Sequence, residues 1–303
     1  MDMPDLYHID KMRVRASFNK AANRYDAAAI LQKEVRQRMF ERLDLIKIKP
    51  QTILDAGSGT GHASRLLARK FNDSRIIQLD IAMGMLQQGR RPDSLTARIT
   101  NSFSQLLGTA GPEAICGDLE NLPLADNSID FIWSNLAVQW CNNLDGAFGE
   151  AARVLDRGGL FMFSSFGPDT LKELRESSAV DPDHVHVNRF IDMHDIGDAL
   201  VRVGFSAPVL DVEHFVLTYD DVLAVMRDLK AIGAHNATQG RRRGLAGRNF
   251  LRDLGERYER FRQQGKLPAT FEVVYGHAWK PETPGKLADG SSPITLHRKR
   301  SGQ

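Results

Sequence analysis

Short apolar runs alternate along this chain with stretches whose apolar residues recur at helical spacing. The runs occupy residues 52–55, 75–80, 113–117, 129–133 and 160–166. After the fourth run, Leu144, Phe148, Ala151 and Leu155 lie on one predicted helical face, and the pair Gly158-Gly159 is expected to end that helix. Strands that alternate with helices in this way predict an α/β fold with a doubly wound, mostly parallel sheet.

Helical patterns also flank this core. Leu31, Val35, Met39 and Leu43 recur every four residues within a helical region over 10–45. Downstream, the pattern predicts helices at 195–203, 220–232 and 249–264 and strands at 209–218 and 270–279. We therefore divide the chain into an N-terminal helical lid at 1–49, a domain at 50–280 with helical insertions near 168–194 and 220–268, and a Pro-, Gly- and Ser-rich tail at 281–303 that is expected to be disordered.

Composition narrows the class of protein. The 303 residues are 42% hydrophobic, which is enough for a large core, and the net charge of +2 gives no general indication of nucleic-acid binding. Cys116 and Cys141 form no CxxC pair, which fits a reducing compartment. No segment has the length and hydrophobicity of a signal peptide or a membrane span, so we expect a cytoplasmic protein with neither nucleic acid nor membrane as partner.

A glycine-rich turn follows the first apolar run, in the order Asp55, Gly57, Gly59, Gly61. Such glycines allow a tight turn and a close approach of backbone to ligand, although dinucleotide-binding proteins use similar turns. The acid directly before the glycines would repel a pyrophosphate, so a cationic or phosphate-free ligand fits better. Asp80 ends the second run, where a ribose diol needs an acceptor, and Asp118 follows the third, where an adenine amino group can be bound.

Together, the turn and the acids resemble the class I S-adenosylmethionine methyltransferases over roughly residues 50–165. The resemblance implies a Rossmann-like fold, with a seven-stranded, mostly parallel sheet, helices on both faces and a helical lid. It also implies S-adenosylmethionine as methyl donor and no metal. The cofactor-binding residues that it implies are Asp55, Gly57, Gly59, Gly61, Asp80, Ile81, Asp118, Leu119 and Asn135.

The junction after the fourth run narrows the substrate. Methyltransferases that act on amino groups of DNA bases or glutamine typically carry Asn-Pro-Pro-Tyr there, whereas this chain has Ser134-Asn135-Leu136-Ala137. The junction also offers no general base, which a phenol or alcohol usually needs. A carboxylate is already ionised at neutral pH and needs none, so positioning and removal of water can supply most of its catalysis.

A second, more specific resemblance extends over most of the chain. The segments 18–26, 134–141, 188–190 and 226–234 look like those of the malonyl-[acyl-carrier protein] O-methyltransferases of biotin synthesis. That family methylates the free carboxylate of a malonyl thioester, so the implied partner is acyl-carrier protein carrying malonyl, or malonyl-CoA. The segments 166–171 and 268–270 also resemble mitochondrial complex I assembly factors, a group that includes a protein-arginine hydroxylase. A hydroxylase, a methyltransferase for another small molecule and a non-catalytic assembly factor therefore stay open as alternatives.

Four residues are candidates for contact with the substrate or for catalysis: Tyr25, Asn135, Trp140 and Arg189. An Arg189 guanidinium can pair with the substrate carboxylate, and a structural salt bridge is the equally weighted alternative. Tyr25 can close over the cofactor, or simply pack the N-terminal helices on the sheet. Gln139 and Trp140 are expected to line the methyl-transfer site, although core packing is the commoner role of a tryptophan.

Two further clusters have both a functional and an ordinary interpretation. His184, His186 and His194 invite a metal site, but no further ligand has suitable spacing and methyl transfer from a sulfonium needs no metal. The segment from Arg241 to Lys266 carries nine basic residues against three acids. Because acyl-carrier proteins are acidic, this segment is a candidate docking surface, although a solvated helix face is the commoner explanation.

Overall fold

A computed structural model describes residues 5–90, 113–179, 184–234, 236–241 and 248–282. Residues 283–303 of the tail predicted at 281–303 lie outside these ranges, as do the basic residues Arg242 and Arg243. Seven strands form one sheet in the order β3-β2-β1-β4-β5-β7-β6. The strands are β1 (Thr52–Ala56), β2 (Arg75–Asp80), β3 (Glu113–Cys116), β4 (Ile129–Ser134), β5 (Leu155–Phe166), β6 (Ser206–Tyr219) and β7 (Leu267–Trp279). Neighbouring strands are parallel from β3 to β5, and β7 is antiparallel to both β5 and β6.

Helices cover both faces of the sheet because side chains of buried parallel strands alternate between two apolar layers. Ile53 and Phe131 pack into one layer with α2 and α3, whereas Leu54 and Ile132 pack into the other with α6 and α8. The helices are α1 (Lys11–Ala28), α2 (Ile30–Leu43), α3 (His62–Lys70), α4 (Met83–Gly89), α6 (Leu144–Val154), α7 (Lys172–Ser178), α8 (Met193–Arg202), α9 (Val222–Ala231) and α10 (Arg248–Tyr258). Within the described ranges, no helix is both long and apolar enough to span a membrane.

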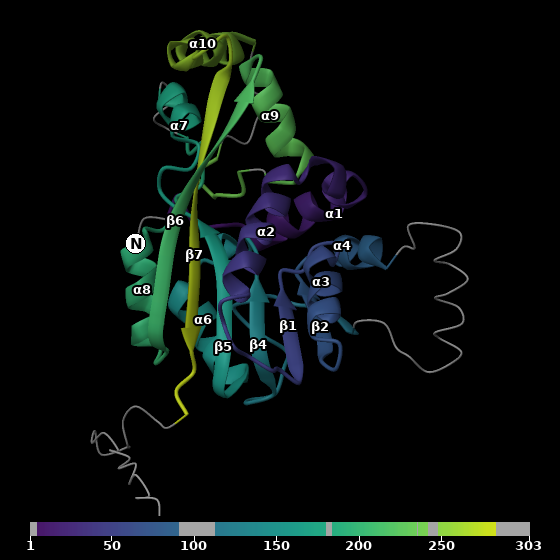
Figure 1. Cartoon of the computed structure of the whole chain (residues 1–303). Coiled ribbons are helices and arrows are strands. Elements are labelled where there is room, and N and C mark those ends of the chain that lie inside the picture. The colour runs from purple at the N-terminus through teal and green to yellow at the C-terminus, as the bar shows by residue number, and fades with distance from the viewer. Residues whose placement is uncertain (1–4, 91–112, 180–183, 235, 242–247, 283–303) are drawn as a thin grey trace, which may run out of the picture.

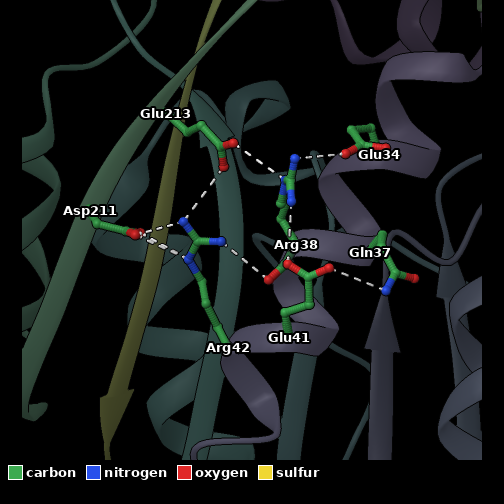
Figure 2. Close-up of polar contacts among 7 residues, drawn as sticks. All are labelled: Glu34, Gln37, Arg38, Glu41, Arg42, Asp211 and Glu213. Atoms are coloured by element: carbon green, nitrogen blue, oxygen red, sulfur yellow. Dashed lines mark hydrogen bonds and ion pairs between the residues drawn. The ribbon is translucent and has the colours of Figure 1, made fainter.

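Helix α2 is fixed to the sheet by ion pairs as well as by its apolar face (Figure 2). Arg42 donates to both carboxylate oxygens of Asp211 on β6, at 2.6–3.2 Å, and its guanidinium lies 3.8 Å from the ring centroid of Tyr275. One turn earlier, Arg38 contacts Glu213 at 3.3 Å. These contacts tie α2 to the two antiparallel strands at the edge of the sheet.

Beyond the sheet, β6 and β7 continue as a two-stranded ribbon that reaches the helices α7, α9 and α10 (Figure 1). Pairing between β5 and β7 ends at Phe166 and Val273, whereas β6 and β7 remain paired as far as Tyr219 and Leu267. We call this unit the cap: residues 214–219 and 267–272 with α7, α9 and α10. It lies at the carboxyl ends of the parallel strands, the side of the fold where ligands bind in open α/β sheets.

The structure corrects several predicted boundaries. Helix α6 ends at Val154, and Leu155 pairs with Ile129 in the sheet, so Gly158-Gly159 lies inside β5 and does not end a helix. Leu155 continues the apolar face of the predicted helix, and it is also the first apolar residue of the strand. Helical spacing alone therefore could not show that the helix ends before it. Helix α10 ends six residues earlier than predicted, with a 3₁₀ turn at Glu259–Phe261, and β7 begins three residues earlier. Helices α4 and α7 are further elements that the sequence patterns did not resolve.

Candidate functional site

The glycine turn after β1 brings the backbone close to the β4–α6 junction. Gly57 has φ +81°, and a Cβ at that position would lie less than 3.0 Å from the Cβ of Ala137. The Gly57 and Ser58 amides donate to the Leu79 carbonyl at 2.7 and 2.9 Å, which fixes the turn against the end of β2. A side chain is therefore excluded here both by the backbone conformation and by lack of space.

Two acids lie buried beside this turn, and neither forms an ion pair with another described residue. Asp55 is 1% exposed and accepts a hydrogen bond from the Ser64 hydroxyl of α3, and burial raises the pKa of its carboxyl to about 7. Asp80 accepts from the Gly59 and Ala82 amides, both at 2.8 Å, and burial raises its pKa to about 6. Each acid is thus costly to ionise until a cation or several donors approach it. This is the environment that a cationic ligand with a ribose diol fits.

The structure brings most of the predicted cofactor residues around one cavity, which we call the cofactor cavity. Its walls include Tyr25, Gly57, Gly59, Asp80, Ile81, Asp118, Leu119, Asn135 and Trp140. Asp55 and Gly61 do not line the cavity; Gly61, with φ +74°, instead faces the side chain of Gln78. The cavity holds about 70 Å³, well below the roughly 300–1,000 Å³ of typical ligand sites. Helix α1 contributes several wall residues, so this helix narrows the pocket.

Lys11 holds the start of α1 against the cavity, and the sequence analysis did not identify it. Its ammonium contacts Asp118 at 2.8 Å and Glu120 at 2.5 Å. Asp118, which was predicted to meet an adenine amino group, is therefore already paired through its Oδ1. Further along α1, the Phe18 ring meets Trp140 edge to face, with centroids 5.4 Å apart. Polar contacts at one end and aromatic contacts in the middle thus close α1 over the pocket.

Arg36 on α2 is a second residue that sequence reasoning missed. Its partial burial lowers its pKa, and the charges of Asp55 and Asp26 oppose that change. The same arginine opposes the rise that burial produces in the pKa of Tyr25. A cation on α2 therefore influences the acids at the bottom of the site. An arginine within a regular amphipathic helix gave no sequence signal that distinguished it from its charged neighbours.

The β4–α6 junction forms a wall common to three hollows. Asn135 is fixed by its amide donating to the Gln32 carbonyl at 3.1 Å and by a hydrogen bond from the Ser164 hydroxyl at 3.1 Å. Beyond it, Trp140 lines both the cofactor cavity and an apolar cavity under the cap, and Gln139 lines that apolar cavity and a polar groove. Cys141 lines the groove and the cofactor cavity, and burial raises the pKa of its thiol to about 12. The thiol is thus protonated at neutral pH and is no nucleophile.

Arg189 lies apart from the cofactor cavity. It is exposed on the wall of the polar groove, which holds about 1,200 Å³, and makes no hydrogen bond or ion pair within the described residues. His184 and His186 line the same groove, with ring centroids 6.5 Å apart, whereas His194 pairs with Asp192. No group of three potential metal ligands occurs in the part of the chain that the structure describes. Arg189 can meet only those ligands that reach this groove.

Much of the predicted basic docking segment is already paired with acids. Arg260 contacts Glu176 at 2.9 Å, and Lys266 contacts Asp220 at 2.5 Å. Arg252 and Arg262 pair with acids inside the segment itself. These pairs favour a solvated helix face for the described portion, and any docking charge must come from the rest of the segment.

Comparison with known folds agrees with this architecture. Residues 54–163 match a family model described as a methyltransferase domain. The YcgJ protein from Bacillus subtilis is similar in structure, with a TM-score of 0.54 and 16% identity over 81% of this chain and 98% of that one. A methyltransferase candidate from Bacillus halodurans gives a TM-score of 0.55 and 18% identity over the same shares. The predicted Rossmann-like class I methyltransferase fold is thus confirmed.

Similarity over the whole chain is more specific. The chain is 61% identical over 297 residues to a malonyl-[acyl-carrier protein] O-methyltransferase from Methylovorus sp. (strain MP688), which covers 98% of both chains. It is 52% identical to the protein of that name from Laribacter hongkongensis, over 97% of this chain and 98% of the relative. The identity includes the C-terminal half, where the sequence alone left an assembly factor open. The chain therefore belongs to the malonyl-[acyl-carrier protein] O-methyltransferase family of S-adenosylmethionine-dependent enzymes.

Proposed function

We propose that the protein transfers a methyl group to the free carboxylate of a malonyl thioester on acyl-carrier protein, an early step of biotin synthesis. The observation that carries this proposal is the β4–α6 junction. It joins the cofactor cavity to two further hollows, yet Asn135, Gln139 and Trp140 provide no acid, no base and no nucleophile. A substrate that arrives already ionised needs none of these. The names of the relatives, whose identity extends over nearly the full chain, support the same substrate.

S-adenosylmethionine, when bound, supplies a methyl group on a sulfonium that is ready for displacement. Asp80 would hold the ribose hydroxyls, since its carboxylate is already oriented by the Gly59 and Ala82 amides. Asp55 would provide negative charge beneath the cationic end of the ligand, with Ser64 fixing its orientation. Ile81 and Leu119 would enclose the adenine, and Asn135 would form the wall towards the substrate.

We propose that residues 1–49 act as a lid over this pocket. Tyr25 and Phe18 on α1 contribute apolar surface to the cavity, and Trp140 packs against Phe18. Closure of these rings would exclude water from the two reacting groups, which strengthens their electrostatic interaction and prevents hydrolysis. The small volume of the cavity supports a lid that must open before the cofactor enters and closes again afterwards.

Arg189 is our candidate for orienting the malonyl carboxylate. Its guanidinium is exposed in the groove and has no competing partner among the described residues, so it is available to an anionic ligand. The acyl-carrier protein would dock through the basic segment from Arg241 to Lys266, with coenzyme A as a surrogate carrier. We place the enzyme in the cytoplasm, supported by the free thiols of Cys116 and Cys141.

The decisive experiment is incubation with methyl-labelled S-adenosylmethionine and malonyl-acyl-carrier protein. We expect label in a base-labile ester on the carrier, and we expect none when acetyl replaces malonyl because acetyl has no free carboxylate. Cofactor binding without any transfer to the malonyl carrier would refute the proposed activity.

Arg189→Ala should raise the KM for the malonyl substrate about tenfold while it leaves S-adenosylhomocysteine affinity unchanged. Arg202→Ala, which removes another arginine from the same groove, is the matched control.

A further inference from the structure

The cap encloses a second cavity of about 480 Å³ that the cofactor does not need. Its walls are mostly apolar and come from five elements: Phe166 at the end of β5, Leu174 on α7, Leu229 on α9, Leu251 on α10 and Phe271 on β7. A malonyl group is short and charged, so it does not account for an apolar space of this size. The cavity has room for another, apolar part of a ligand.

The inner end of this cavity meets the candidate site of methyl transfer. Trp140 is a wall of both the apolar cavity and the cofactor cavity, and Gln139 continues that wall towards the polar groove that contains Arg189. A chain that entered through the cap would therefore end beside the cofactor. Its terminal carboxylate would lie on the side of the groove.

Two buried acceptors along the apolar cavity have no hydrogen-bond donor among the described residues. Gln139 donates from Nε2 to the Leu136 carbonyl at 2.7 Å, which fixes the orientation of its amide and leaves Oε1 buried and unpaired. Asn188 is 8% exposed, and its Oδ1 is likewise unpaired. Unpaired buried acceptors are rare in proteins because they lose their hydration without compensation. A ligand with N–H donors in this cavity would satisfy both atoms.

The outer end of the cavity is cationic. Arg227 and Lys230 line it from α9, and both side chains are exposed. The one ion pair of Arg227 within the described residues, to Asp221, is 3.8 Å long, and Lys230 has none there. An anionic group at the entrance would therefore meet two positive charges that are not strongly engaged elsewhere.

We propose that this cavity is the channel for the phosphopantetheine arm that carries the malonyl group, an inference that rests on the proposed function. The arm matches the channel in order: a phosphate at one end, then a dimethyl-bearing carbon, then two amides with N–H donors, then the thioester. The phosphate meets Arg227 and Lys230, the apolar part packs under the cap, and the amides donate to Asn188 and Gln139. The thioester then lies at Trp140.

Binding of free pantetheine, measured by calorimetry in the presence of S-adenosylhomocysteine, tests the channel without relying on turnover. Met226→Trp fills the cavity from its rim on α9, and we expect pantetheine affinity to fall at least about tenfold. Asn188→Leu keeps the branching and the number of non-hydrogen side-chain atoms but removes the acceptor, and we expect a loss of about five- to tenfold, the value of one neutral hydrogen bond. Val201→Trp adds the same ring to an exposed site on α8, outside the cavity, and should change affinity less than twofold.

Unchanged thermal unfolding and S-adenosylhomocysteine affinity in all three variants establish that they are folded. Pantetheine affinity that is equal in wild type, Met226→Trp and Asn188→Leu would refute the proposed channel, even if malonyl-CoA is methylated normally.

Methylation of malonyl on the truncated thiol N-acetylcysteamine, which lacks the phosphate and the dimethyl part, should be unaffected by Met226→Trp, whereas the KM of this variant for malonyl-CoA should rise about tenfold. If wild type methylates no malonyl thioester but binds pantetheine as described, the channel is supported and the proposed substrate is wrong.

Discussion

Substitution of Gly57 by alanine tests whether the glycine turn is set by backbone conformation alone or also by contact with the β4–α6 junction. Gly57 and Gly265 have nearly the same φ, +81° and +78°. Around Gly265 nothing lies within 4 Å of an added Cβ, whereas at Gly57 the new methyl would overlap Ala137. Gly265→Ala therefore measures the cost of left-handed backbone, and Gly57→Ala measures the same cost plus the overlap.

The two costs can be separated in magnitude. A left-handed conformation costs an alanine about 1–2 kcal/mol, and this applies to both variants. Overpacking of a well-filled site adds about 1–3 kcal/mol. The overlap is hard to relieve because the junction is itself held: Leu136 has φ +50°, and its amide donates to the Ser164 hydroxyl at 2.9 Å. We expect Gly57→Ala to lower the free energy of unfolding by about 2–5 kcal/mol and Gly265→Ala by about 1–2 kcal/mol.

Chemical denaturation of the two variants, together with Gly57→Ala/Ala137→Gly, provides the measurement. Removal of the Ala137 methyl should recover the overlap cost, and a double-mutant cycle corrects for the effect of Ala137→Gly by itself. S-adenosylhomocysteine binding should be weakened by Gly57→Ala and unchanged by Gly265→Ala. Equal destabilisation by the two alanines, or no coupling between positions 57 and 137, would show that the close approach has no energetic consequence.

Four further outcomes are expected. S-adenosylmethionine affinity should rise about tenfold or more from pH 5.5 to 7.5 and then level off. The reason is that burial raises the pKa of Asp55 to about 7 and that of Asp80 to about 6, and both carboxyls must ionise to meet the cation. An affinity that calorimetry finds constant over this pH range contradicts the roles of Asp55 and Asp80 in cofactor binding. In the ligand-free protein the raised pKa values of Asp55 and Asp80 give the opposite pH dependence. The stability that these two carboxyls contribute is lost as pH rises through 6–7, and thermal unfolding at several pH values measures that loss. Lys11→Met should free Asp118 and speed association of S-adenosylhomocysteine in stopped-flow measurements, and an unaltered association rate means that the Lys11 pairs do not restrain the lid. Arg42→Met should cost about 1–2 kcal/mol in urea denaturation, the sum of a partly exposed ion pair and a cation–π contact, and a value near zero refutes the role of this contact in fixing α2.

The parts of the site that could be predicted from sequence lie on the parallel strands. In such a sheet the carboxyl ends of the strands come together at one edge, so the order of Asp55, Asp80 and Asp118 along the chain already indicates a shared location. Asp80 and Asp118 line the cavity, and Asp55 lies buried beside the glycine turn. The alternation of Ile53 with Leu54 and of Phe131 with Ile132 likewise specifies two buried faces. Where strands and helices are regular, the sequence pattern of a residue thus predicts its place in the fold.

The remainder depends on contacts between segments distant in sequence. Lys11 and Arg36 lie on helices with ordinary charge patterns, and only the docking of these helices brings them near Asp118 and Asp55. The position of Gly158 inside β5 depends on an irregular register with β4 that no periodicity reports. The unpaired acceptor of Gln139 emerges only once the cap is present, because burial, not residue type, makes that atom costly.

The ribbon of β6 and β7 makes the part of the cap that carries α9 and α10 a replaceable unit. The two strands cross from sheet to cap without a loop, and Phe215 pairs with Phe271 just outside the sheet. A cut at this pair would separate α9 and α10 from the strands that carry the candidate cofactor site while it leaves both ladders in register. A cap from another methyltransferase of the same fold could be grafted there, with the exchanged chain entering and leaving along paired strands of fixed direction. Substrate preference in this architecture should therefore be transferable by recombination at two neighbouring points, with no redesign of the cofactor site.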